Sequence, residues 1–121
     1  WLQTPRRVTA SISHMAATVT LSSEPINFGG GLLFVHGTIT MDSSYPTGGE
    51  AVTPGQFKGG SFVRLMLSAS TTGIVPAWDA TNSKVMAFWV DTTVDGAALG
   101  EVANSTDLAT TVFPFVAYMR P

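Results

Sequence analysis

The sequence has no cysteine and few charged residues. Among 121 residues there are six Lys or Arg and eight Asp or Glu, so charged residues make up 12% of the chain, against roughly 25% in an average soluble domain. Without cysteine there can be no disulfide, thiolate metal site or thiol nucleophile. Stability must come from buried apolar surface and hydrogen bonds. Either Ser, Thr and Gly or partner subunits must cover the rest of the surface.

Long apolar runs and basic clusters are also missing. No apolar run approaches the roughly 20 residues that span a bilayer, and the start of the sequence lacks the cationic and apolar segments of a signal peptide. The net charge is −2, and the longest basic cluster is Arg6-Arg7. We therefore expect neither a membrane nor a nucleic acid as a partner.

Helical periodicity is nearly absent, and short β-branched and aromatic segments recur between turn signals instead. These segments predict strands at 8–13, 17–22, 32–41, 62–68, 97–103 and 110–119, and a hairpin over 74–90 that turns at 79–83. The pattern predicts a single all-β domain over 8–121, an antiparallel β-sandwich or jelly-roll-like fold, preceded by an N-terminal arm at 1–7.

One long segment, 42–61, has no strand periodicity and contains two prolines and five glycines. Loops of this length are uncommon inside compact domains and usually have a function. Within the segment, Thr53-Pro54 predicts a helix cap followed by proline at the first helical position, and hence one helical turn near 54–57.

Two predicted strands are apolar on both faces, whereas the others alternate with polar residues. In segment 85–90, Trp89 falls on one face and Phe88 on the other; in 112–119, Phe115 lies opposite Tyr118. Only one face of a sandwich strand meets the core, so the second face needs a cover. The cover is either another subunit or the long loop at 42–61, and the pattern is the main sequence evidence for oligomerisation.

Residues that could carry chemistry do not form a recognisable constellation. We expect His14 in a turn and His36 on a strand face, and most carboxylates lie at turns, where Asp is favoured by its bonds to the backbone. Asp42 and Glu50 share the long loop, but their spacing does not match an EF-hand. No Gly-Lys-Ser/Thr follows the glycines at 29–31, as a phosphate loop would require. We therefore expect no enzyme activity, no cofactor and no metal.

Three stretches occur in a familiar order. They are DSSYPTGGE at 42–50, followed by Val52-Thr53-Pro54 and Phe57; WDATNSKV at 78–85, followed by Phe88-Trp89; and EVANSTDL at 101–108, leading into the last apolar strand. Together the chain over about 37–119 resembles a family of small virion proteins of tailed bacteriophages. The first stretch is the most distinctive of the three.

The resemblance implies a capsid decoration (cement) protein, a compact β-sandwich, often trimeric, that binds the outer shell where capsomers meet. It implies that the partners are the major capsid protein and further copies of the chain in a homotrimer. The location would be the capsid surface of the virion, after synthesis in the host cytoplasm. Alternative functions are another virion part, such as a head fibre base, neck or tail component, or a carbohydrate- or receptor-binding module.

We expect the interface residues in the arm, the long loop and the two-faced strands. In the arm, docking is one interpretation of the two arginines and simple solvation the other. Exposed Trp78, Trp89 or Tyr45 in one groove would instead indicate a sugar-binding platform. The predicted interface residues are Trp1, Leu2, Arg6, Arg7, Tyr45, Pro46, Phe57, Met86, Phe88, Trp89, Phe113, Phe115 and Tyr118.

Overall fold

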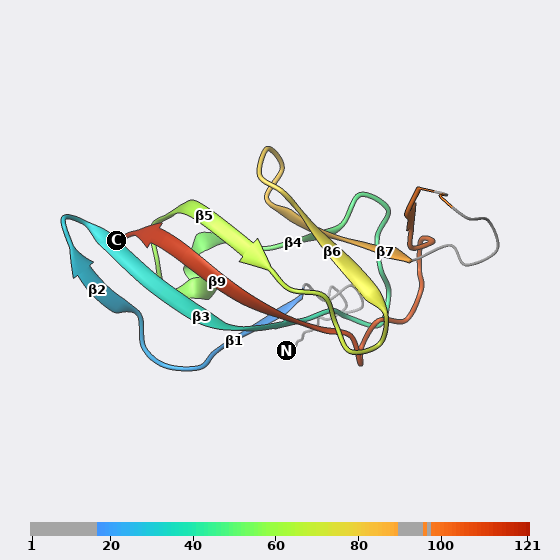
Figure 1. The fold of residues 1–121 in the computed structure, drawn as a ribbon, viewed down its shortest axis with the longest axis horizontal. Coiled ribbons are helices and arrows are strands. Elements are labelled where there is room, and N and C mark those ends of the chain that lie inside the picture. The colour runs from blue at the N-terminus through green and yellow to red at the C-terminus, as the bar shows by residue number, and fades with distance from the viewer. Residues whose placement is uncertain (1–16, 90–95, 97) are drawn as a thin grey trace, which may run out of the picture.

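The computed structural model describes residues 17–89, 96 and 98–121. The predicted arm at 1–7 and the predicted strand at 8–13 lie outside these residues. The described part of the chain forms two antiparallel sheets that pack against each other, with no α-helix among its elements (Figure 1). The predicted antiparallel β-sandwich is confirmed.

The five-stranded sheet is built on the long central pair β3 (Leu32–Thr40) and β9 (Val112–Arg120). Strand β5 (Ser61–Leu67) extends this sheet beyond β9. On the other side, β1 (Thr18–Leu21) and β2 (Ile26–Gly29) pair with successive parts of β3 and form one interrupted edge.

Strand β2 lies in a region, 23–31, that the sequence predicts as a loop. Gly29, Gly30 and Gly31 all have positive φ values, of 84°, 64° and 77°. Glycine adopts this left-handed backbone conformation with little steric strain, because it has no Cβ atom. The conformation reverses the chain tightly enough for β2 to pair with β3. The glycines therefore form a hairpin turn.

The four-stranded sheet is centred on β7 (Lys84–Trp89). It pairs with β6 (Ile74–Asp79) in the predicted hairpin, and β4 (Glu50–Ala51) and β8 (Gly100–Glu101) line its other edge. At the hairpin turn, Oδ1 of Asp79 accepts hydrogen bonds from the backbone N–H groups of residues 81 and 82, at 3.1 and 3.2 Å. This is the local bonding that favours Asp at turns.

The core lies between the two sheets and follows the predicted alternation. The buried residues of β9 are Phe113, Phe115, Ala117 and Met119. The buried face of β7, which carries Val85 and Ala87, lies opposite them. Successive side chains of a strand point to opposite faces, so each long strand contributes every second residue to the core.

The predicted helical turn near 54–57 is confirmed as a 3₁₀ helix, η2 (Pro54–Phe57). Its cap is reinforced by a 2.7 Å hydrogen bond from the backbone N–H of Thr53 to Oε1 of Gln56. The helix ends in the core at Phe57, whose ring meets the edges of Phe62 and Phe115 at centroid distances of 5.0 and 4.9 Å.

Strand β5 corrects the predicted faces of segment 62–68. The sequence pattern places Val63 with Leu65 on one face and Phe62 on the other, but Val63 is half exposed while Phe62 packs against the core. The register shifts between Phe62 and Arg64 at a β-bulge. A bulge inserts one extra residue, and this reverses which face the preceding side chains occupy.

Candidate interaction surface

The outward face of the five-stranded sheet carries a cluster of aromatic rings. Phe28 stacks on Phe34 with 5.7 Å between centroids and an interplanar angle of 6°, and Tyr118 lies 5.7 Å from Phe34. His36 continues the cluster, 5.4 Å from Phe34. Phe28 remains 58% exposed, so a large apolar ring faces solvent.

Strand register explains why these side chains meet. Ile26, Phe34, Tyr118 and Arg64 occupy directly opposite positions on four neighbouring strand segments. Directly opposite residues of antiparallel strands point to the same face, so they form one row across the sheet. The next row joins positions 36, 116 and 66 in the same way. We call the apolar members of this cluster the aromatic patch: Ile26, Phe28, Phe34, Met66, Val116 and Tyr118.

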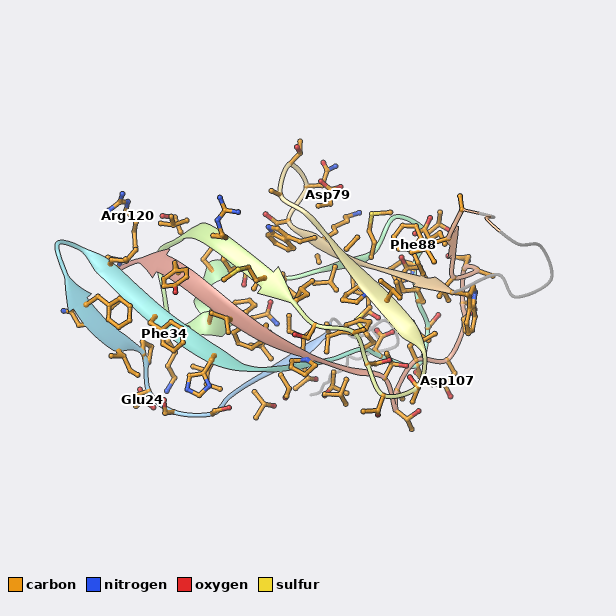
Figure 2. The ribbon with its side chains drawn as sticks, in the orientation of Figure 1. Glu24, Phe34, Asp79, Phe88, Asp107 and Arg120 are labelled. Carbon is orange, nitrogen blue, oxygen red and sulfur yellow. The ribbon has the colours of Figure 1, made fainter. Side chains whose placement is uncertain are left out.

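The same face becomes polar toward its other end. Thr20 lies opposite Thr38, and Thr18 lies opposite Thr40. Arg64 shares a row with the patch, and Arg120 lies near the same end of the molecule as Phe34, whereas Asp107 lies at the far end (Figure 2). The aromatic patch is therefore a bounded surface with charged residues near it, Arg64 and Arg120 as well as Glu24 at the same end of the molecule (Figure 2).

A second apolar area lies on the four-stranded sheet. Trp89 is 44% exposed and Leu99 is 46% exposed. On the opposite face of β7 from Trp89, Met86 and Phe88 are half-buried. A Cβ atom on Gly49 would approach Cγ of Met86 to 3.0 Å, so the long loop covers part of the outer face of β7.

Four of the predicted interface residues belong to the core, which corrects their assignment to a surface. Tyr45, Phe57, Phe113 and Phe115 are at most 3% exposed. Phe113 and Phe115 of β9 face the opposing sheet, and Phe57 closes the core through η2. The sequence pattern does not distinguish the inner face of β9 from its outer face, because both are apolar.

The other predicted interface residues divide into three groups. Pro46 and Trp89 are exposed, and Met86, Phe88 and Tyr118 are half-buried. Of these, only Tyr118 belongs to the aromatic patch. The arm residues Trp1, Leu2, Arg6 and Arg7 lie outside the described residues.

Sequence reasoning missed Ile26, Phe28 and Phe34. A signal was available for Phe34, because it lies two positions before His36 and four before Thr38, and so shares their outward face. For Phe28 no comparable signal existed, since β2 is short and pairs only through the glycine turn at 29–31.

The three aromatic residues considered as a sugar platform do not gather. Tyr45 is buried, and Trp78 and Trp89 lie at opposite ends of the β6–β7 hairpin, opposite Val85 and Ile74. Trp78 packs edge-on against Phe62 with 5.2 Å between centroids. It lines a shallow groove of about 300 Å³ beside Arg64, but it is also part of the core packing.

The three stretches that begin at Asp42, Trp78 and Glu101 meet in space. In backbone bonds, the N–H of Tyr45 donates to the carbonyl of Thr106 at 2.9 Å, and the N–H of Val52 donates to the carbonyl of Ser83 at 3.0 Å. The Tyr45 hydroxyl accepts from the N–H of Ala87 at 3.1 Å. Segments 42–50, 78–89 and 101–108 therefore form one hydrogen-bonded unit at the end of the sandwich away from the aromatic patch (Figure 1).

A buried acidic network lies inside this unit. Oε2 of Glu101 accepts hydrogen bonds from the Tyr45 hydroxyl and from the N–H of Gly48, both at 2.7 Å. Glu50 is 2% exposed, and its Oε2 accepts a 3.1 Å bond from the N–H of Asp42. Burial raises the pKa of Glu50 to about 7, and burial followed by the Glu101 contact raises the pKa of Tyr45.

The candidate chemical groups show no catalytic arrangement in the described residues. The side chain of His36 lies against an aromatic ring and makes no hydrogen bond there, and His14 lies outside the described residues. Within 17–89, 96 and 98–121, no three His, Asp or Glu side chains gather as a metal site. The helical elements of this part are too short to cross a membrane.

Comparison with known proteins found no matching family model, curated protein or solved structure. The fold and the surface define the class instead. The chain is an all-β antiparallel sandwich with a buried core and an exposed aromatic patch on one sheet.

Proposed function

We propose that this protein is a capsid decoration protein of a tailed bacteriophage, which binds the outer shell and stabilises it through subunit contacts. The observation that carries the proposal is the aromatic patch. Ile26, Phe28 and Met66 expose 45%, 58% and 44% of their surface within it. Contiguous exposed apolar surface on a soluble domain is typical of a contact site for another macromolecule. The resemblance of segments 42–50, 78–85 and 101–108 to small virion proteins of tailed bacteriophages supports a phage particle as the assembly.

Two apolar areas on different sheets support two kinds of contact. We assign the aromatic patch to the major capsid protein, because it is the larger cluster and has Arg64 and Arg120 beside it. We assign the area at Trp89 and Leu99 to other copies of the chain in a homotrimer. A shell-bound oligomer gains from multivalency, since each contact raises the effective concentration of the next.

The mechanism is burial of apolar surface without any covalent step. Each square ångström of apolar surface removed from water contributes about 25 cal/mol. Phe28 already stacks on Phe34, and Tyr118 packs against both rings at a tilted angle, so a partner would meet a surface that is largely ordered before binding. Such preorganisation lowers the entropy lost on association.

The test is binding of the purified protein to capsids that lack it, with heat resistance of the particles as the second readout. We expect Phe28→Ser to weaken binding at least tenfold and to abolish the gain in heat resistance. Phe28 is mostly exposed, so this variant should fold normally. Val112→Ser is the matched control, because Val112 is a partly exposed residue at the threonine end of the same sheet.

Two results would count against the proposal. One is a Phe28→Ser variant that binds and protects capsids like the unaltered protein. The other is virions lacking the protein that resist heat and osmotic shock unchanged. Locating the protein in a particle map would distinguish decoration of the shell from a place in a head fibre, neck or tail.

A further inference from the structure

Glu50 is the most unusual buried group in the described part of the chain. It is 2% exposed, and its Oε1 is the single buried side-chain oxygen or nitrogen there without a hydrogen-bond partner. A buried carboxylate oxygen without a donor is costly, because it has lost water and gained nothing in exchange. Protonation reduces this cost, since a neutral carboxyl is less strongly hydrated than a carboxylate.

A second carboxyl stands beside it. The Asp42 side chain is within hydrogen-bonding reach of Glu50, while the backbone N–H of Asp42 donates to Oε2 of Glu50 at 3.1 Å. Two carboxylates can only accept hydrogen bonds, so they repel each other when both are charged. One proton converts the pair into a donor and an acceptor, and therefore satisfies a bond that neither carboxylate can make alone.

The other groups around Glu50 do not supply a compensating positive charge. Tyr45 of the same loop stays neutral because burial raises its pKa, and its hydroxyl donates to the carboxyl group of Glu101 on β8. Lys84 of β7 lies opposite Ala51, whereas Glu50 lies opposite the buried Val85. Alternation along the strand therefore places Lys84 on the other face of the sheet. Among the described residues, the surroundings of Glu50 therefore favour its protonated, neutral form over its charged form.

The pair joins the two ends of one segment. Asp42 follows β3 of the five-stranded sheet, and Glu50 begins β4 of the four-stranded sheet. Between them lies the segment that buries Tyr45. We propose that Asp42 and Glu50 share one proton in the folded protein, and that its loss to solvent as pH rises weakens the attachment of segment 42–50.

The sign of the effect follows from linkage. Burial is the main cause that raises the pKa of Glu50 from 4.5 to about 7; the Asp42 N–H opposes the shift, and the Asp42 carboxyl reinforces it. An unfolded chain therefore releases this proton at lower pH than the folded one. The unfolding equilibrium constant should rise by up to about tenfold per pH unit from about pH 4.5 to about pH 7, and this contribution should be constant above that.

The experiment is urea unfolding of the full chain at a series of pH values from 5 to 8, with the Glu50→Gln and Glu24→Gln variants. Glutamine at 50 keeps an acceptor for the Asp42 N–H and offers an amide donor to the Asp42 carboxylate. We expect this variant to be more stable than the unaltered protein at pH 8 and to lose the slope between pH 5 and 7. Glu24→Gln is the matched control, since Glu24 is exposed; it should keep the slope.

A direct titration keeps the proposal testable even if Glu50→Gln folds poorly. Carboxyl ¹³C NMR of the unaltered protein should show one glutamate titrating near neutral pH, and Asp42→Asn should lower that midpoint. All glutamates titrating near pH 4.5 would overturn the proposal, as would a Glu50→Gln variant with the unaltered slope. Stabilisation by millimolar Ca²⁺ at pH 8 that is lost in Glu50→Gln would also overturn it, because the pair would then hold a cation.

Discussion

The hydroxyl of Tyr45 donates a 2.7 Å hydrogen bond to Oε2 of Glu101, although 56 residues separate them in the chain. The same hydroxyl accepts a bond from the N–H of Ala87 on β7. Tyr45 therefore joins the long loop to two strands of the four-stranded sheet, and it does so with no exposed surface. In a chain without disulfides, this buried contact is one of several hydrogen bonds that hold the loop in place.

Removing that hydroxyl should destabilise the fold. Tyr45→Phe would leave the N–H of Ala87 and an oxygen of Glu101 each short of one hydrogen bond in a buried site. We expect a loss of about 1 to 3 kcal/mol in the free energy of unfolding, as for other buried groups left without a partner. Urea unfolding at neutral pH measures it. Tyr118→Phe is the control, since the Tyr118 hydroxyl makes no hydrogen bond among the described residues, and an equal loss there would contradict the prediction.

The aromatic residues of the core and of the patch should respond differently to truncation. Phe113 is fully buried, so Phe113→Ala should cost about 3 to 5 kcal/mol through lost burial and a residual cavity. Phe28 is mostly exposed, and Phe28→Ala should cost far less, about 1 kcal/mol or below. Thermal unfolding of both variants tests this. Equal destabilisation would mean that Phe28 is part of the core, and would remove the patch as a binding surface.

Gly49 should not tolerate a side chain. Its φ is 105°, and a Cβ atom there would lie 2.7 Å from the carbonyl oxygen of Val85. Gly49→Ala should therefore destabilise the protein by about 1 to 3 kcal/mol, because both the backbone conformation and the contact are strained. Gly55→Ala is the matched control, since no atom lies within 4 Å of the added methyl group. A neutral Gly49→Ala would show that the loop can move away from β7.

The isolated protein should associate through the apolar area at Trp89 and Leu99. We expect light scattering coupled to size-exclusion chromatography to show a homotrimer. Trp89→Ser should shift the population toward monomer without changing the thermal midpoint of a dilute sample by more than a few degrees. A monomeric unaltered protein at high concentration would contradict the homotrimer, while leaving the proposed contact of the aromatic patch with the capsid open to its own test.

Local patterns were enough to predict much of the fold. Alternation placed the buried residues of β3 on one face, and Thr53-Pro54 predicted η2. In β9 it grouped Phe113 with Phe115, but it did not show that their face is the buried one. The Asp79–Ser83 turn predicted the hairpin. Each of these features depends on neighbours a few residues apart: two-residue alternation, a proline with fixed φ, or a side chain bonding to its own turn. Such features can be inferred from sequence because no distant contact is needed to produce them.

Other features were decided only by the tertiary structure. The bulge at Val63 reverses the face of Phe62, and the pairing of β2 with β3 brings Phe28 onto Phe34. Tyr45 is buried because β7 and β8 offer its hydroxyl two partners. The sequence by itself determined a cysteine-free β-sandwich in which two strands are apolar on both faces, although only one face of each can meet the core. Which of those faces stays exposed depends on strand register and on contacts between residues far apart in the chain, and no local pattern records them.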